Sequence, residues 1–204
     1  ELLKNHKYGH PYGSTIERDL TNDGVLEFII KIGGGFAIYT CNGGIYESLM
    51  SWLGHVYHVI IIDIKDMNKD NLPEIVIGEQ TCDGHCLDTY ILEWNGQELN
   101  NLIEWETLTL SNAEIIDKNY DGVPELVMSG PFPSMGNMYG YIPIRGQKDI
   151  YSWNGNTFSL SYQEFSIPEY RFQAVQDADQ DVLDGNFDNA LLVYKDVIFD
   201  DGLK

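Results

Sequence analysis

Short apolar runs rich in β-branched residues recur along the first three quarters of the chain, at residues 28–30, 59–62, 75–77 and 126–128. Their length and composition are typical of buried strands. Further aromatic or aliphatic stretches end in Asn-Gly pairs at residues 42–43, 95–96 and 154–155. An Asn-Gly pair between such runs indicates a hairpin, because both residues accept a positive φ. Two strands from the apolar runs, followed by the two strands of an Asn-Gly hairpin, therefore predict a repeating four-stranded unit.

The hydrophobic pattern changes after Pro168, where apolar residues recur at spacings of three and four. This period predicts two helices, with Pro168 near the first helix start and residues 200–202 near the last helix end. Residues 185–194, which read Gly-x-Phe-x-x-Ala-Leu-x-x-Tyr, resemble the turn and second helix of a tetratricopeptide unit. The acidic residues at 177, 179, 181 and 184 fall inside this helical pattern, so we interpret them as a solvated helix face.

A nine-residue acidic motif is repeated in one frame and joins strands within each unit. Its copies begin at Asp19, Asp66 and Asp117, about 50 residues apart. That spacing lies in the range expected for propeller blades or similar arrays. We therefore predict a mainly β domain at residues 1–166 and a helical hairpin at 167–204. The β domain should contain three propeller-blade-like, four-stranded repeats, with units at about residues 15–58, 59–108 and 109–166.

Each motif offers oxygen atoms at its alternate positions. Positions 1, 3, 5 and 9 carry Asp, Asn, Thr or Glu, position 6 is Gly or Asn, and position 7 can add its backbone carbonyl. A tightly curled loop of this kind suits a hard cation such as calcium, which takes six to eight oxygen ligands. The candidate ligands are Asp19, Thr21, Asp23, Val25 and Glu27; Asp66, Asn68, Asp70, Leu72 and Glu74; and Asp117, Asn119, Asp121, Val123 and Glu125.

The motif differs from an EF-hand, which places its bidentate Glu at position 12 and flanks the loop with helices. Position 12 is apolar in all three copies, at Ile30, Ile77 and Met128. The pattern resembles instead the FG-GAP/VCBS calcium loop of integrin-like β-propellers. This resemblance covers about residues 15–165 and implies about three calcium ions. The alternative is that these residues only form hairpin turns, in which Asp, Asn and Gly are common.

The charge balance limits the possible partners. The 204 residues include 32 acidic and 12 basic side chains, for a formal net charge of −20. Such a chain repels nucleic acids and anionic membrane surfaces, and bound cations would relieve its self-repulsion. No apolar run approaches the roughly 20 residues that a membrane-spanning helix needs.

Cys82 and Cys86 enclose a three-residue polar turn, for which we expect a disulfide bond, with Cys41 left over as a small buried residue. Two unpaired thiols are the alternative. A disulfide favours an extracellular or cell-surface location, with a signal peptide already removed.

Familiar catalytic motifs are missing from the sequence: it has no Gly-x-Ser-x-Gly, Walker loop or His-Glu-x-x-His. The expected function is therefore a calcium-stabilised, non-enzymatic binding or adhesion module that contacts a protein, another copy of the chain or a glycan. A structural subunit of an extracellular assembly and a glycan-active enzyme domain are the alternatives. Residues 131–145 form an aromatic- and Met-rich insertion found in one unit only, which predicts either a recognition loop or a lid on the β core.

Overall fold

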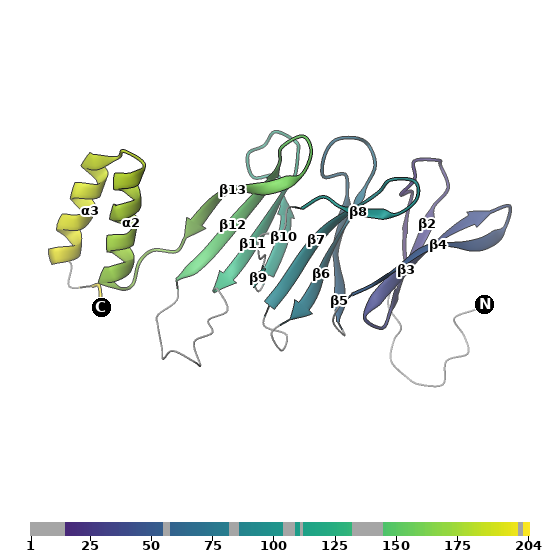
Figure 1. Cartoon of the computed structure of the whole chain (residues 1–204), viewed down its shortest axis with the longest axis horizontal. Helices are drawn as coiled ribbons and strands as arrows, with labels where there is room; N and C mark the ends of the chain where they lie inside the picture. The colour runs from purple at the N-terminus through teal and green to yellow at the C-terminus, as the bar shows by residue number, and fades with distance from the viewer. Residues whose placement is uncertain are drawn as a thin grey trace.

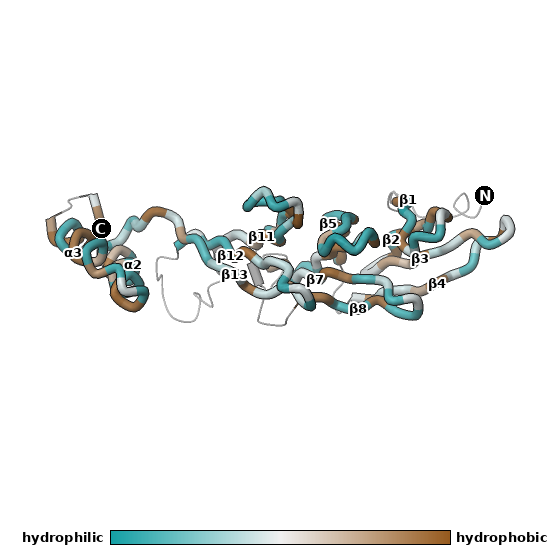
Figure 2. Tube along the Cα trace, turned by 90° about the horizontal axis from the view of Figure 1, so that it is seen from above, coloured by the Kyte–Doolittle hydropathy of each residue, from teal (hydrophilic) through white to brown (hydrophobic). Residues whose placement is uncertain are grey.

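The computed structural model describes residues 15–54, 58–81, 86–103, 109–110, 112–131, 145–199 and 202–204. Three antiparallel β-sheets follow one another along the chain, and two helices come after them (Figure 1). The prediction of three four-stranded units followed by a helical hairpin is confirmed at this level. In the described part of the chain the sheets stand in an open row and do not close into a ring (Figures 1 and 2).

The three sheets share one strand order, in which each strand pairs with its neighbour in sequence. The first sheet contains β1 (Ile16–Arg18), β2 (Glu27–Ile32), β3 (Gly35–Asn42) and β4 (Ile45–Leu53). The second contains β5 (Val59–Lys65), β6 (Glu74–Thr81), β7 (Cys86–Trp94) and β8 (Leu99–Asn101), with β9 (Thr109–Leu110) also paired to β7. The third contains β10 (Asn112–Ile116), β11 (Glu125–Pro131), β12 (Gly146–Trp153) and β13 (Phe158–Phe165).

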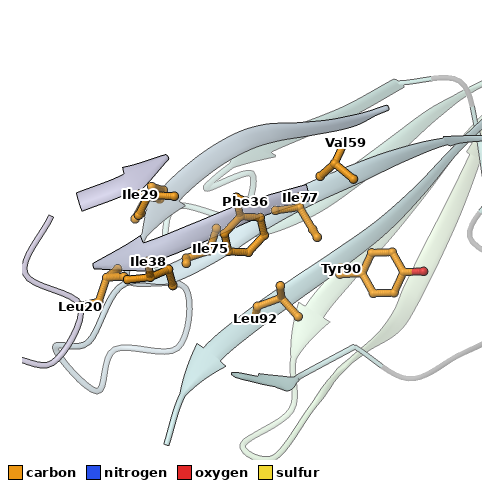
Figure 3. Packing of buried hydrophobic residues seen from close by; sticks show 10 residues of the cluster. Leu20, Ile29, Phe36, Ile38, Val59, Ile75, Ile77, Tyr90 and Leu92 are labelled. Atoms are coloured by element: carbon orange, nitrogen blue, oxygen red, sulfur yellow. The ribbon is translucent and has the colours of Figure 1, made fainter. Parts of the chain in front are cut away.

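The core consists of two apolar layers, one on each face of the second sheet. Successive side chains of a strand point to opposite faces, so Ile75 and Ile77 of β6 face the first sheet while Val76 faces the third. The layer between the first and second sheets is shown in Figure 3 and contains Leu20, Ile29, Phe36, Ile38, Val59, Ile64, Ile75, Ile77, Tyr90 and Leu92. The layer between the second and third sheets contains Met67, Val76, Ile91, Leu102, Ile103, Leu126, Met128, Tyr151 and Phe158.

The second residue of each acidic motif is apolar where another sheet follows in the row of described sheets and polar where none does. Leu20 and Met67 hold this position in the first two motifs, and each is buried against the next sheet in the row. The third motif has Lys118 there, and its ammonium group lies over the Tyr162 ring and pairs with Glu164 of β13. No further sheet follows on that side in the described structure, which accounts for a polar residue at this position.

The helical hairpin consists of α2 (Arg171–Leu183) and α3 (Phe187–Phe199), which pack on each other at one end of the row (Figure 1). Its principal described link to the sheets is Arg145, which donates two hydrogen bonds to the Asp177 carboxylate and one to the Ser166 carbonyl. The Arg145 guanidinium also lies over the Phe165 ring. Asp177 is therefore an ion-pair partner and not only part of a solvated face. Neither described helix has the length and apolar character needed to cross a membrane.

Truncation at the second motif position is a direct test of the stacking. We expect Met67→Ala to lower the free energy of unfolding by about 2–5 kcal/mol, because it leaves a cavity between two sheets. Lys118→Ala removes only a partly exposed ion pair and should cost less than about 1 kcal/mol. Both variants keep the backbone N–H at this position, so the pair isolates side-chain packing. Urea unfolding of the metal-free proteins measures the difference, and equal losses would contradict the stacking described here.

Candidate metal centre in the acidic loops

The three acidic loops lie at one edge of the row of sheets, the upper edge in Figure 1. We define them as residues 19–27, 66–74 and 117–125; they connect β1 to β2, β5 to β6 and β10 to β11. The second and third loops touch, since the Lys69 ammonium donates a hydrogen bond to the Asp121 carbonyl at 2.6 Å. The first and second loops share an open hollow of about 410 Å³, lined by Thr21 of the first loop and by Asp70 and Leu72 of the second.

The glutamate at position 9 closes each loop at its base. Its side chain is buried, at most 3% exposed, and one carboxylate oxygen accepts a hydrogen bond from the backbone N–H of position 2. The donor–acceptor pairs are Leu20 to Glu27 (2.7 Å), Met67 to Glu74 (2.6 Å) and Lys118 to Glu125 (2.8 Å). This charge-assisted bond joins the first residues of the loop to the strand that follows it.

The aspartates at positions 1 and 5 organise the rest of the loop. The carboxylate at position 1 accepts the N–H of position 6, from Gly24, Asn71 and Gly122, at 2.9, 3.1 and 2.9 Å. The carboxylate at position 5 accepts the N–H of position 7, from Val25, Leu72 and Val123, at 2.8, 2.7 and 2.7 Å. In the third loop the Val123 N–H, with a smaller contribution from the Asn119 amide, lowers the pKa of Asp121. The loops therefore share one hydrogen-bond frame, although their sequences differ.

Two residues of each loop have a left-handed backbone. Position 6 has φ of 83°, 72° and 82° at Gly24, Asn71 and Gly122, in agreement with the curl expected from the sequence. Position 4 also has positive φ, between 56° and 64°, although Asn22, Lys69 and Tyr120 occupy it. Left-handed φ costs a side-chain-bearing residue about 1 kcal/mol or more. Sequence reasoning missed this position because only Asn22 belongs to a residue type that favours it.

Each loop contains one buried oxygen atom without a hydrogen-bond partner among the described residues. These atoms are Thr21 Oγ1, Glu74 Oε1 and Asp117 Oδ1. All three belong to predicted ligand residues, at positions 3, 9 and 1. An unsatisfied buried polar atom costs about 1–3 kcal/mol, so its recurrence in each loop favours a group that binds oxygen. The donor set, carboxylates with hydroxyl or amide oxygens, fits a hard divalent cation.

The second loop has the strongest electrostatic perturbation. Burial, opposed by the hydrogen bond from the Met67 N–H and reinforced by Asp70, Asp66 and Glu93, raises the pKa of Glu74 to about 8. Glu93 of β7 was not predicted as a site residue, yet its carboxylate lies within 4.8 Å of those of Asp70 and Glu74. Burial and the charge of Asp70 also raise the pKa of Glu93. Only the β6–β7 register brings Glu93 beside the loop.

The remaining sequence predictions fall largely on other parts of the chain. Cys82 and residues 132–144 of the insertion lie outside the described residues, so the expected disulfide and recognition loop stay predictions. Cys86 is buried at the start of β7, whereas Cys41 is a free thiol that is only partly buried. Of the insertion, Arg145 is described, and its guanidinium is engaged by Asp177 within the chain.

No protein-family model matches this chain, and a search of curated proteins found no match.

The raised pKa of Glu74 predicts a pH-dependent stability of the metal-free protein. Below pH 4.5 this carboxyl is protonated in both folded and unfolded chains, but between pH 4.5 and about 8 only the folded chain keeps the proton. The contribution of Glu74 to stability is therefore fully present at low pH and is lost as pH rises to about 8.

We expect Glu74→Gln to flatten this part of the stability profile, by a few kcal/mol at pH 8. Urea unfolding in the presence of a chelator, at pH 5, 6.5 and 8, measures the effect. Glu47→Gln, on the exposed part of β4, is the matched control. Parallel pH profiles for the wild type and Glu74→Gln would rule out the assigned protonation of Glu74.

Proposed function

We propose that this chain is a calcium-stabilised, non-enzymatic binding module whose three acidic loops each hold one calcium ion. The observation that carries the proposal is the unpartnered buried oxygen in every loop, on a residue already identified as a ligand from the sequence repeat. The presence of such oxygens on ligand residues in all three loops favours bound cations over loops that serve only as turns. A cation would use these oxygens and would also offset part of the net charge of −20.

The loop frame supports binding without a large rearrangement. The N–H groups of positions 2, 6 and 7 hold one oxygen of the carboxylates at positions 9, 1 and 5, respectively. In Glu74 and Asp117 the second oxygen is buried and has no partner among the described residues, so it can serve a cation. Hydrogen bonds to the ligands orient them and commonly strengthen metal sites. We infer that folding alone orders most of the site, so that calcium binds to a largely preformed loop.

The row of four-stranded antiparallel sheets supports the resemblance to FG-GAP/VCBS repeats. Propeller blades are four-stranded sheets of this kind, and a ring needs about four to eight of them. We propose that the three sheets are consecutive blades with a calcium ion at the same edge of each. Ring closure would require further blades, from a longer chain or from other copies, and sedimentation of the purified protein distinguishes these cases.

The way the loop carboxylates are used supports binding over catalysis. The six Asp residues at positions 1 and 5 and the three Glu residues at position 9 accept backbone N–H groups within their own loops. Groups fixed in this way suit a rigid scaffold that presents other surfaces to a partner. We propose a protein, a second copy of the chain or a glycan as that partner, in an extracellular setting, and an assembly subunit as the second candidate.

Removal of the metal tests the proposal directly. Calcium-saturated protein should contain about three ions per chain by elemental analysis, and chelation should lower its Tm because calcium binds the folded state only. Single substitutions at the first loop position, D19N, D66N and D117N, should each remove one ion. Glu47→Gln changes the same charge on an exposed strand and should remove none.

The proposal fails if the chelated and calcium-saturated proteins melt at the same temperature and neither contains bound metal. Loss of all three ions in each single variant would instead indicate one shared site, contrary to three separate loops.

A further inference from the structure

The second loop faces an acidic residue that the other loops lack. In each sheet the glutamate at position 9 lies opposite the residue two places before the Asn-Gly turn, as the neighbouring pairs Phe28–Tyr39, Ile75–Leu92 and Leu126–Tyr151 establish. That facing residue is Thr40 in the first sheet, Glu93 in the second and Ser152 in the third.

In the first loop the facing residue satisfies the glutamate. The Thr40 hydroxyl donates a hydrogen bond to Glu27 Oε1 at 3.1 Å, while Glu27 Oε2 accepts the Leu20 N–H. Both oxygens of the buried carboxylate therefore have donors from the protein. Such a site is complete with or without a metal at this glutamate.

In the second loop the same place holds a second carboxylate. Glu74 is fully buried, its Oε2 accepts the Met67 N–H, and its Oε1 has no partner among the described residues. Oxygens of Asp70, Glu74 and Glu93 lie within 4.8 Å of one another. Ionised carboxylates this close repel one another strongly where water is partly excluded. The cluster therefore needs protons or a cation.

Asn68 fixes Glu93 against the loop. Its side-chain Nδ2 donates to Glu93 Oε1 at 3.1 Å, and its Oδ1 accepts the Asp70 N–H at 2.9 Å. Glu93 is thus held toward the loop by a hydrogen bond, although its charge would favour turning toward solvent. This arrangement orients a carboxylate from β7 as part of the second loop site.

We propose that Glu93 is a ligand of the cation in the second loop and makes this loop the tightest of the three calcium sites. The loop then has four carboxylates, from Asp66, Asp70, Glu74 and Glu93, compared with three in each of the other loops. Ligand charge is a main determinant of calcium affinity. The inference rests on the proposed function of the loops as calcium sites and adds a ligand from outside the repeated motif.

Two substitutions in the β7–β8 hairpin test the role of Glu93. We expect Glu93→Gln to raise the Kd of the tightest calcium class at least about tenfold. The matched control Glu98→Gln, which removes the same charge from an exposed position in the adjoining turn, should change it less than about twofold. Competition with a chromophoric calcium chelator measures these constants, and D66N should abolish the same tight class.

Terbium gives a local readout of the same site. Trp94 lines the hollow together with Asp70 and Glu93, so excitation of this indole should sensitise luminescence from terbium in the second loop. Trp94→Phe should remove the first-saturating part of the signal, and Glu93→Gln should shift its midpoint to higher terbium. If the first terbium signal saturates at the same terbium concentration in the wild type and in Glu93→Gln, the assignment is overturned.

Stability of the metal-free protein separates a ligand from a structural residue. Because Glu93 lies beside the Asp70 carboxylate when no cation is present, Glu93→Gln should melt at the same or a higher temperature than wild type in excess chelator. If Glu93→Gln has a lower metal-free Tm and unchanged calcium dissociation constants, Glu93 has a structural role and the proposal is refuted. If calcium binds the wild type but Glu93→Gln behaves as Glu98→Gln does, the inference fails and the proposed function stands; if the wild type binds no calcium, both fail.

Discussion

The hydrogen bond from the backbone N–H of the second loop residue to the buried glutamate at position 9 is the interaction on which the other features of the site depend. It places a carboxylate at the base of each loop, between two strands of the same sheet, and recurs at 2.6–2.8 Å in all three copies. The same bond fixes the second residue of the loop, whose side chain packs against the next sheet in the first two loops. In these two loops one contact therefore links loop closure to sheet stacking.

The loops differ in how the charge of this buried carboxylate is compensated. A buried charge is tolerated when hydrogen bonds or an opposite charge compensate it. The first loop uses the N–H of Leu20 and the hydroxyl of Thr40 for this purpose. The second loop has an N–H on one oxygen and a carboxylate opposite the other. Burial, with smaller contributions from Asp70, Asp66 and Glu93, raises the pKa of Glu74 to about 8. The three copies of one motif thus differ in how strongly they require a cation or a proton.

The stacking of the sheets explains the residue type at the second loop position, which the hydrogen bonds of the loop do not. Leu20 and Met67 are buried because a sheet follows theirs in the row, whereas Lys118 reaches Tyr162 and Glu164 of its own sheet. The second sheet, covered on both faces, accordingly contains the most continuous run of buried residues among the described strands, residues 74–79 of β6. At the far end of the row Arg145 joins β12 to α2 through Asp177, so the helical hairpin is tied to the sheets mainly by polar contacts.

The sequence by itself determined the three β units, the helical hairpin and the positions of the acidic loops, because these depend on local periodicity and turn chemistry. The curl at Gly24, Asn71 and Gly122 was predictable for the same reason, since Gly and Asn tolerate left-handed φ. Tertiary structure decided the rest. The left-handed backbone at Lys69 and Tyr120 is imposed by the shared hydrogen-bond frame against the preference of those residues. Glu93 meets Glu74 only through the register of β6 and β7, across a separation of 19 residues that no local pattern encodes. A nine-residue motif fixes which atoms can act as ligands, but the neighbouring strand sets the charge that those atoms face.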